Sequence, residues 1–313
     1  MRRDLLGAVT PSDFAPLSLH LHNQTTPHTA PMGTAVDTSI HPHATGPAAE
    51  LVAAHSADYA LKLYAGWFCP FVQRAWMVLV EKRIAHQYVE INPYHKSPEF
   101  LALNPRGLVP ALVVPAASPG RTTKPLYESA VLCEFLDEAF ADQTAHGPRL
   151  LPDDAYERAV CRIWMDHVAG KIVPAWYRLM QHTAEKPYGI HEARAELHTH
   201  LLTLAREMAN GGPWFLGERF TLVDVMLAPW AVRLWLIDYY KDGGVGIPDP
   251  ESGGEDETAW KRWRTWLAAI EERRSVVETS STKDMYIGVY KRYADDTTNS
   301  EVGQATRSGR RLP

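Results

Sequence analysis

Strand-like and helix-like patterns alternate along the first half of the chain. Apolar and polar residues alternate over residues 59–64, as they do in a strand with one buried face. From residue 72 to residue 83 the apolar side chains recur at spacings of three and four, which is typical of an amphipathic helix. Further elements are expected, in chain order, as strands at 86–91, 108–114 and 126–127 and helices at 98–101 and 129–140. The resulting βαβ, short helix, ββα order predicts an α/β domain whose first two strands are parallel and whose last two are antiparallel.

The second half of the chain shows almost no strand pattern. Helical periodicity covers four stretches, at 153–182, 191–210, 221–241 and 257–274. Thr221 and Asp224 form a variant capping box in front of an apolar run, and Pro229 is expected to kink the helix that follows. We therefore expect an all-α helical bundle domain after the α/β domain.

The two ends of the chain are polar. Residues 1–55 are rich in His, Pro, Thr and Ala and contain few large apolar side chains, so we expect a disordered or loosely attached extension. Its histidines, His20, His22, His41 and His43, leave metal binding open, although a solvated tail is the favoured interpretation. The expected domain boundaries are 1–55 for the extension, 56–141 for the α/β domain, 142–152 for a linker, 153–294 for the helical domain and 295–313 for a polar tail.

Composition excludes several classes of function. The chain has 313 residues, of which 45% are hydrophobic and 22% charged, with a formal net charge of -5, so a nucleic-acid-binding surface is not expected. No apolar run approaches the ~20 residues that a membrane span needs. Three cysteines are too few for a disulfide framework and fit a reducing compartment, which points to the cytoplasm.

Cys69 is the residue most suited to chemistry. It lies where a loop meets the amphipathic helix that ends near residue 83, with Pro70 in the first turn of that helix. Free backbone N–H groups and the helix dipole at that position favour a thiolate, which makes Cys69 a candidate nucleophile, with a buried structural cysteine as the alternative. Val72 stands where a second cysteine of a dithiol motif would be, so an external thiol must resolve any mixed disulfide. Cys133 and Cys161 fall within amphipathic helices and are expected to be buried and inert.

Three motifs in order resemble the N-terminal domain of glutathione transferases. They are Phe68-Cys69-Pro70-Phe71, the stretch from Asn104 to Pro110, and Leu126-Tyr127-Glu128-Ser129. Phe220 to Asp224 and Ala228-Pro229-Trp230 continue the resemblance into the helical half, so that it spans roughly residues 59–275. The cysteine makes the chain most similar to the omega-like class. The resemblance implies a thioredoxin-like first domain, glutathione as co-substrate, no metal, and a homodimer.

The resemblance also implies roles for individual residues. Pro110 would follow a cis peptide bond that leaves the backbone of Val109 free to pair with the cysteinyl part of glutathione. Glu128 and Ser129 would bind the γ-glutamyl end; from the residues alone they would be a surface charge and a helix N-cap. Lys96 would meet the glycyl carboxylate from one position before the usual lysine. Phe71 completes the expected glutathione-binding set, and the acceptor pocket is assigned to Trp176, Tyr177, Trp230 and Arg233. Asp224 is assigned to folding.

These residues support three hypotheses on function. The favoured one is a thiol transferase in which Cys69 forms a mixed disulfide with glutathione, removes glutathione from other thiols or reduces dehydroascorbate. A conjugating transferase acting on small electrophiles is the alternative, but related classes place Tyr or Ser at the position of Cys69. The third hypothesis is a non-catalytic ligand-binding protein of the same fold. Reduction of glutathionyl hydroquinones is chemically similar to the thiol transferase reaction.

Overall fold

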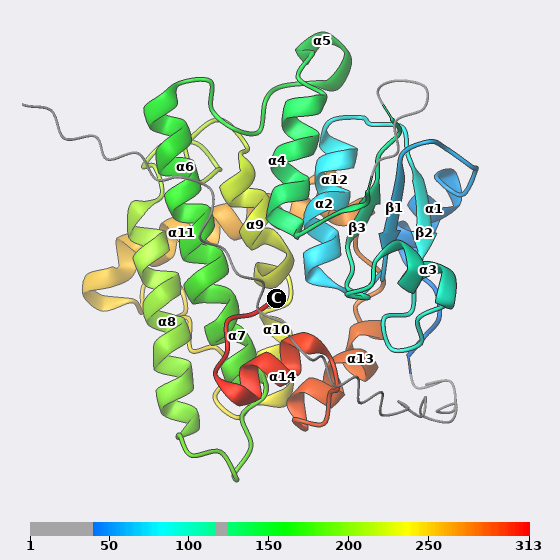
Figure 1. The fold of residues 1–313 in the computed structure, drawn as a ribbon. Helices are drawn as coiled ribbons and strands as arrows, with labels where there is room; N and C mark the ends of the chain where they lie inside the picture. The colour runs from blue at the N-terminus through cyan, green and yellow to red at the C-terminus, as the bar shows by residue number, and fades with distance from the viewer. Residues whose placement is uncertain (1–39, 117–123) are drawn as a thin grey trace, which may run out of the picture. The chain divides into compact units, whose positions relative to one another are not determined.

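The computed structural model describes residues 40–116 and 124–313. The four strands are β1 (Lys62–Ala65), β2 (Gln87–Glu90), β3 (Ala111–Val113) and β4 (Leu126–Tyr127), in the order β2-β1-β3-β4 (Figure 1). Strand β1 pairs parallel with β2 and antiparallel with β3, and β3 pairs antiparallel with β4. This mixed sheet confirms the predicted βαβ-ββα domain.

Three helices belong to the sheet domain: α2 (Pro70–Glu81), α3 (Pro98–Leu103) and α4 (Ser129–Ala139). Helix α2 forms where the apolar spacing predicts it and buries Val72, Ala75, Trp76 and Leu79. Each large apolar side chain buried in this way contributes roughly 1.5–3 kcal/mol to stability. Helix α4 packs beside α2, so the N-termini of both helices are held on one rigid layer (Figure 1).

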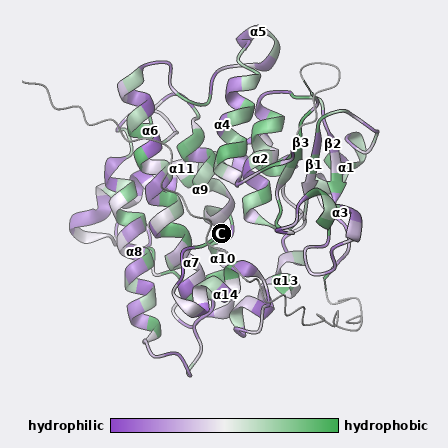
Figure 2. Cartoon of the chain, in the orientation of Figure 1, coloured by the Kyte–Doolittle hydropathy of each residue, from purple (hydrophilic) through white to green (hydrophobic). Residues whose placement is uncertain are grey.

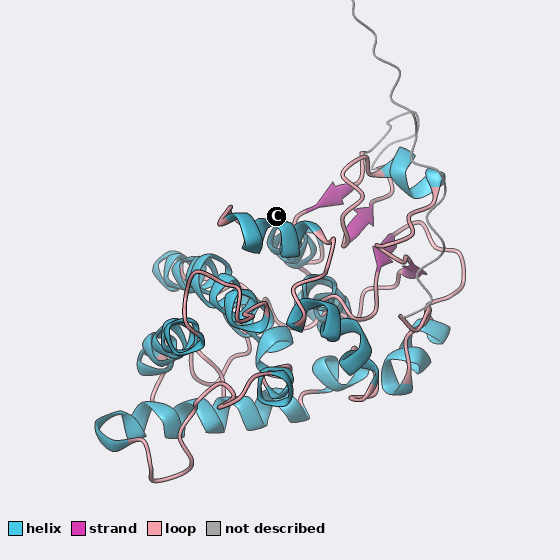
Figure 3. Cartoon of the chain, turned by 90° about the horizontal axis from the view of Figure 1, so that it is seen from below, coloured by secondary structure: helices cyan, strands magenta, loops and turns pink. Residues whose placement is uncertain are grey.

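The helices from α5 to α14 form the second domain, and their arrangement confirms the predicted all-helical domain (Figure 3). They are α5 (Gln143–His146), α6 (Ala155–His167), the π-helical turn η1 (Val168–Ile172), α7 (Val173–Met180), α8 (Ile190–Glu207), α9 (Leu222–Ala231), α10 (Trp235–Tyr240), η2 (Gly254–Asp256), α11 (Glu257–Glu272), α12 (Arg274–Glu278), α13 (Met285–Ala294) and α14 (Glu301–Ser308). All ten residues of α9 are buried, and this helix packs against α2, α6 and α11. Hydrophobic and hydrophilic faces alternate on the outer helices α6 and α8 (Figure 2). Within the described residues no helix is long and apolar enough to cross a membrane.

The single helix predicted over 221–241 is divided into α9 and α10. The capping box is present as predicted, because the Asp224 carboxylate accepts hydrogen bonds from the Thr221 N–H at 2.8 Å and from its hydroxyl at 3.0 Å. Beyond Pro229 the pattern of helical backbone hydrogen bonds changes. The Pro229 carbonyl accepts from the Arg233 guanidinium at 2.6 Å, while the Arg233 N–H turns to the Trp230 carbonyl at 3.0 Å. The helix therefore ends at Ala231.

The segments predicted as an extension, a linker and a polar tail contain ordered structure. Residues 46–54 form α1 (Gly46–Ala54), which packs on α12, so the predicted extension 1–55 is wrong over this part; residues 1–39 lie outside the described residues. The predicted linker 142–152 is fixed by Asp137, whose carboxylate accepts from the N–H groups of Leu150 and Leu151. The predicted tail 295–313 contains α14. In each case side-chain hydrogen bonds and small buried apolar residues, Ala48 and Ala305 among them, supply the order that low hydrophobicity alone did not suggest.

Candidate functional site

One cavity, of about 180 Å³, lies between the sheet domain and the C-terminal segment. It brings Cys69 together with every residue that the sequence assigned to glutathione, namely Phe71, Lys96, Val109, Pro110, Glu128 and Ser129. These residues come from the N-termini of α2 and α4, the turn before β3 and the loop before α3. The predicted glutathione side of the site is therefore one continuous surface.

Cys69 occupies the N-cap position of α2. Its carbonyl accepts the first helical hydrogen bond, from the Gln73 N–H at 3.1 Å, and Pro70 is the first residue of the helix. The side chain is half-buried and faces the cavity, with Sγ 4.0 Å from the carbonyl oxygen of Val109. By contrast, Cys133 and Cys161 are buried. Cys69 is thus placed where a ligand in the cavity can reach its sulfur.

Two opposing effects act on the pKa of Cys69. Burial raises the pKa of the thiol above its ordinary value, and this is the largest effect on it. The backbone N–H groups of Val72 and Phe71 at the helix N-terminus lower it, as predicted, and the guanidinium groups of Arg233 and Arg74 act in the same direction. Desolvation of the sulfur, which the sequence did not predict, outweighs these effects.

The turn before β3 carries the predicted backbone feature. The peptide bond between Val109 and Pro110 is cis, which confirms the expectation drawn from the resemblance. Both residues line the cavity beside Cys69. Asn104, at the end of α3, donates from its amide to the Leu108 carbonyl at 2.9 Å and so holds this turn in place.

Glu128 and Ser129 meet the cavity at the start of α4. Glu128 is the N-cap residue, with a φ of 70°, and its exposed carboxylate forms an ion pair with Arg106. Ser129 is the first residue inside the helix, so the alternative of a plain N-cap serine is wrong. Its Oγ is buried and accepts a hydrogen bond from Arg74 Nη1 at 3.2 Å. Backbone N–H groups at this helix N-terminus are free to bind a carboxylate.

Lys96 and Ser97 have separate tasks. Ser97 is the N-cap of α3, and its Oγ accepts from the Phe100 N–H at 3.2 Å. Lys96 lines the cavity and lies against Gly107, where any Cβ would come within 2.9 Å of the lysine Nζ. Gly107 also has a φ of 63°, so a side chain there would be both strained and in collision. Lys96 therefore reaches the cavity although it precedes the helix cap by one residue.

The four residues predicted for the acceptor pocket do not line the cavity. Trp176, Tyr177, Trp230 and Arg233 are each at most 2% exposed. Trp176 packs edge-on against Tyr290, and Trp230 packs edge-on against the Phe71 ring with centroids 4.9 Å apart. This prediction is wrong because the rotation of α7 and α9 about their axes turns these side chains into the core, and the sequence pattern did not determine that rotation.

The opposite wall of the cavity comes from the C-terminal segment, which the sequence analysis missed. The residues that line it run from the last turn of α13 to the last residue of the chain: Tyr293, Asn299, Ser300, Glu301, Val302 and Pro313. Ser300 is the N-cap of α14 and accepts from the Gly303 N–H at 3.0 Å, while Gly309 follows the helix in a left-handed conformation. The sequence does contain a helix signal here: Ser300 is a typical N-cap residue, Glu301 follows it in the first turn, and Gly309 is a typical residue after a helix end.

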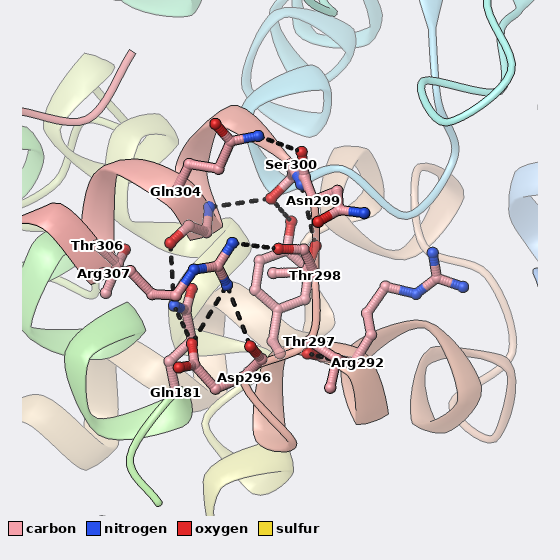
Figure 4. Close-up of polar contacts among 12 residues, drawn as sticks. Gln181, Arg292, Asp296, Thr297, Thr298, Asn299, Ser300, Gln304, Thr306 and Arg307 are labelled. Carbon is pink, nitrogen blue, oxygen red and sulfur yellow. Dashed lines mark hydrogen bonds and ion pairs between the residues drawn. The ribbon is translucent and has the colours of Figure 1, made fainter. Parts of the chain in front are cut away.

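Asp296 anchors this wall to the helical domain. Its carboxylate accepts from Gln181 Nε2 at 3.1 Å and from Arg307 Nη1 at 3.3 Å (Figure 4). It also accepts from Lys186 Nζ at 2.5 Å. Arg307 also donates to the Thr298 carbonyl at 2.7 Å. These contacts connect the segment before α14, the helix itself and α7. The wall is therefore a folded part of the molecule.

The described residues contain no group of three or more His, Cys, Asp or Glu side chains that could hold a metal ion. Of the four histidines considered for metal binding, His20 and His22 lie outside the described residues. His43 Nδ1 lies 2.8 Å from the Glu90 carboxylate, and the His41 carbonyl accepts from Trp67 Nε1 at 2.9 Å. Both contacts tie the segment before α1 to the sheet domain.

Comparisons with known proteins agree with this geometry. The model of the glutathione S-transferase N-terminal domain matches residues 68–139, and that of the C-terminal domain matches residues 154–269. Glutathione S-transferase omega-1 of Sus scrofa is 35% identical over 56% of this chain and 67% of its own length. A probable glutathione S-transferase of Oryza sativa subsp. japonica is 34% identical over 71% of this chain and 90% of its own length.

Solved structures give the same result. The crystal structure of glutathione transferase Omega 3C from Trametes versicolor is similar with a TM-score of 0.65 and 43% identity, over 77% of this chain and 98% of that one. A rice glutathione transferase in complex with glutathione is similar with a TM-score of 0.59 and 28% identity, over 75% of this chain and 100% of that one.

Proposed function

This chain belongs to the glutathione S-transferase family, with omega-class proteins among its relatives, and from that premise we propose that it is a thiol transferase. Glutathione is the co-substrate, and Cys69 is the nucleophile. The observation that carries the proposal is a half-buried cysteine at the N-terminus of α2, in the same cavity as the N-terminus of α4. Relatives that conjugate glutathione use a hydroxyl at this position, whereas a thiol there can form a disulfide.

The proposed cycle has two thiol–disulfide exchanges. The Cys69 thiolate attacks the glutathione sulfur of a mixed disulfide, the acceptor leaves as a thiolate and takes up a proton, and Cys69 is left bonded to glutathione. A second glutathione thiolate attacks that bond, so glutathione disulfide leaves and the Cys69 thiolate is restored. The raised pKa of Cys69 leaves a small thiolate fraction at neutral pH, but nucleophilicity rises with pKa and offsets part of this loss. Dehydroascorbate would enter this cycle by another first step, in which the Cys69 thiolate adds to one of its carbonyl carbons. A glutathione thiolate then attacks the Cys69 sulfur, the sulfur–carbon bond breaks and ascorbate leaves with the electron pair, and a second glutathione resolves the mixed disulfide as above.

Glutathione is proposed to lie along the sheet side of the cavity. Its cysteinyl part pairs with the backbone of Val109, next to Cys69. Its γ-glutamyl carboxylate meets Ser129 and the N-terminus of α4, and its ammonium meets the Glu128 carboxylate, which Arg106 already holds toward the cavity. Lys96 is placed to pair with the glycyl carboxylate. Phe71 forms an apolar contact between the two ends.

A homodimer in the cytoplasm is part of the proposal. Four exposed apolar side chains lie on β4, α4 and α6: Tyr127, Val131, Tyr156 and Ile163. Helices α4 and α6 are joined by an ion pair between Glu134 and Arg162 at 2.6 Å, so these side chains belong to neighbouring elements. A two-fold interface over them would cover apolar surface that is otherwise in water. Three free cysteines fit a reducing compartment.

Intact mass measurement after incubation with oxidised glutathione tests the thiol transferase proposal. We expect an adduct of ~305 Da on Cys69, the mass of a glutathionyl group in a mixed disulfide. Cys69→Ser should lose both the adduct and the transfer of glutathione from a model mixed disulfide. Cys161→Ser is the matched control, because that thiol is buried away from the cavity. Full transfer activity in Cys69→Ser would reject the proposal in favour of conjugation or simple ligand binding.

A further inference from the structure

Two arginine side chains are buried next to the α2 N-terminus. Arg74 and Arg233 are each 2% exposed. Arg74 donates from Nε to the Met226 carbonyl at 3.0 Å and from Nη1 to Ser129 Oγ at 3.2 Å. Arg233 donates from Nη1 to Gln73 Oε1 at 2.5 Å and to the Pro229 carbonyl, and from Nη2 to the Tyr286 hydroxyl at 3.3 Å. All of these acceptors are neutral.

Neither guanidinium group has a carboxylate partner within the described part of the chain. The ion pairs there involve other arginines and lysines, and two nitrogens, Arg74 Nη2 and Arg233 Nε, are buried without a hydrogen-bond partner. A buried cation without a counter-charge is costly, because it has lost its hydration. Arg74 lies 4.4 Å from the centroid of the Trp230 ring and Arg233 lies 4.7 Å from that of the Tyr286 ring, which offsets part of this cost. Burial lowers the pKa of Arg74 to about 9, which still leaves it charged at neutral pH.

Both cations contact residues that lie close to Cys69 on α2. The Arg74 guanidinium lies 5.4 Å from the centroid of the Phe71 ring, and Phe71 lines the cavity with Cys69. Arg233 is bonded to Gln73, whose backbone N–H donates to the Cys69 carbonyl. Both positive charges oppose the effect of burial on the pKa of Cys69. The charged form of Arg74 is in turn favoured by Cys133, Tyr177 and Cys69, in that order.

On the basis of the proposed function, we propose that Arg74 and Arg233 are positioning residues that supply the counter-charge for the Cys69 thiolate, and that Arg74 also directs the Ser129 hydroxyl toward the γ-glutamyl carboxylate. The thiolate is present twice in each cycle, as the attacking group and as the leaving group, so one pair of fixed cations assists both exchanges. Because Ser129 Oγ already accepts from Arg74, its own proton is available for the ligand. Arg74 thus acts on the Cys69 sulfur and on the γ-glutamyl end of glutathione, whereas Arg233 acts on the sulfur alone.

The test is the pH dependence of Cys69 alkylation in the full-length chain, measured with iodoacetamide and followed by mass spectrometry of the Cys69 peptide. We expect Arg74→Met and Arg233→Met to move the inflection to higher pH by about one unit each, and Arg74→Lys to restore most of the shift because it keeps the charge. Arg262→Met is the matched control, since Arg262 likewise donates to backbone carbonyls, those of Ala209 and Trp214, and has no part in the site. Unchanged inflections in the folded Arg74→Met and Arg233→Met variants would overturn the proposal.

A second measurement separates the two arginines. Binding of S-methylglutathione, which cannot form a disulfide, is expected to weaken about tenfold in Arg74→Met and to stay unchanged in Arg233→Met. Equal binding in both variants would remove the role given to Ser129. If Arg74→Met does not fold, Arg74→Gln retains N–H groups for the Ser129 and Met226 oxygens without the charge. Alkylation needs no glutathione, so the two proposals can fail separately. If the variants shift the alkylation inflection but the protein never forms the glutathionyl adduct, the thiol transferase proposal is refuted and the counter-charge role stands.

Discussion

Asp296→Asn is the most informative test of the C-terminal wall of the cavity. Asp296 has a φ of 54°, a conformation that Asn adopts more readily than other residues, so the substitution keeps the backbone and the size of the side chain. It removes the charge that Lys186 and Arg307 share and replaces one of the two acceptor oxygens with an N–H₂ group. We expect α14 and the segment that precedes it to separate from the helical domain more often than in the unchanged protein.

The size of the effect follows from the burial of these contacts. Asp296 and Lys186 are 17% and 14% exposed at their side chains, so their pair is largely shielded from water. Hydrogen bonds to charged groups are worth about 1 kcal/mol more than neutral ones, which gives about 2 kcal/mol for the two pairs. That energy corresponds to about a 30-fold change in the opening equilibrium of α14. The matched control is Asp295→Asn, because Asp295 pairs with Lys291 in a largely exposed position, where about 0.2–1 kcal/mol is expected.

Hydrogen exchange of the α14 amides measures this opening directly. In the regime where exchange follows local opening, we expect the rates over Glu301–Ser308 to rise about 30-fold in Asp296→Asn and less than about fivefold in Asp295→Asn. Amides of α2 should not change. The acceptor KM should rise in parallel, since Asn299 and Val302 line the cavity. Equal exchange rates in the two variants would refute the anchoring role of Asp296.

Three further predictions concern association, stability and ionisation. Ile163→Glu should convert a dimer into monomers in sedimentation velocity runs, whereas Tyr239→Glu, an equally exposed site on α10, should not; a dimer that survives Ile163→Glu contradicts the proposed interface. Asp137→Asn should lower the free energy of unfolding by about 3–5 kcal/mol, because the buried Lys82 ammonium loses its counter-charge. Hydrogen bonds hold the pKa of Asp137 below its ordinary value, so its stabilisation is full above about pH 5 and is lost as the pH falls through that lowered pKa; denaturant titrations that show no such acid loss would contradict this. Wild-type Cys69 should be alkylated with an inflection above that of a solvent-exposed cysteine peptide, since burial raises its pKa, and a lower inflection would show that desolvation does not dominate.

The fold could be predicted because its elements are encoded locally. The alternation over 59–64 and the helical spacing after Val72 lie within a few residues of β1 and α2 as observed. The glutathione side of the cavity was predicted from the resemblance to glutathione transferases, because its residues belong to short motifs at the end of a strand or the start of a helix. Local sequence alone did not assign their roles: without the resemblance, Ser129 would be a plain helix N-cap and Glu128 a surface charge.

The acceptor side depends on tertiary packing and could not be predicted in the same way. Aromatic side chains such as Trp176 and Trp230 are common at binding surfaces. Whether they face a cavity depends on the rotation of α7 and α9 about their axes, which is set by the elements that pack on these helices. The ordered C-terminal segment was missed because it has few large apolar residues, and Asp296 with its cationic partners supplies the binding energy that hydrophobic burial does not. Partners more than 100 residues apart in sequence leave no local pattern.

Arg233 shows how a residue can matter to a site without lining it. It was predicted to touch the acceptor, yet it is buried, and its influence on Cys69 is electrostatic. Contacts act only within van der Waals distance, whereas a charge in a poorly hydrated interior acts over several ångströms more. Loss of the Arg233 charge should therefore slow exchange with every acceptor by the same factor, because the sulfur is common to all of them. Substitution of Val302 or Asn299, which face the cavity, should instead change the ratio of rates between a small disulfide and a glutathionylated protein. A set of acceptors assayed against both kinds of variant separates reactivity from selectivity, and a change of acceptor preference in Arg233→Met would show that this residue contacts the substrate after all.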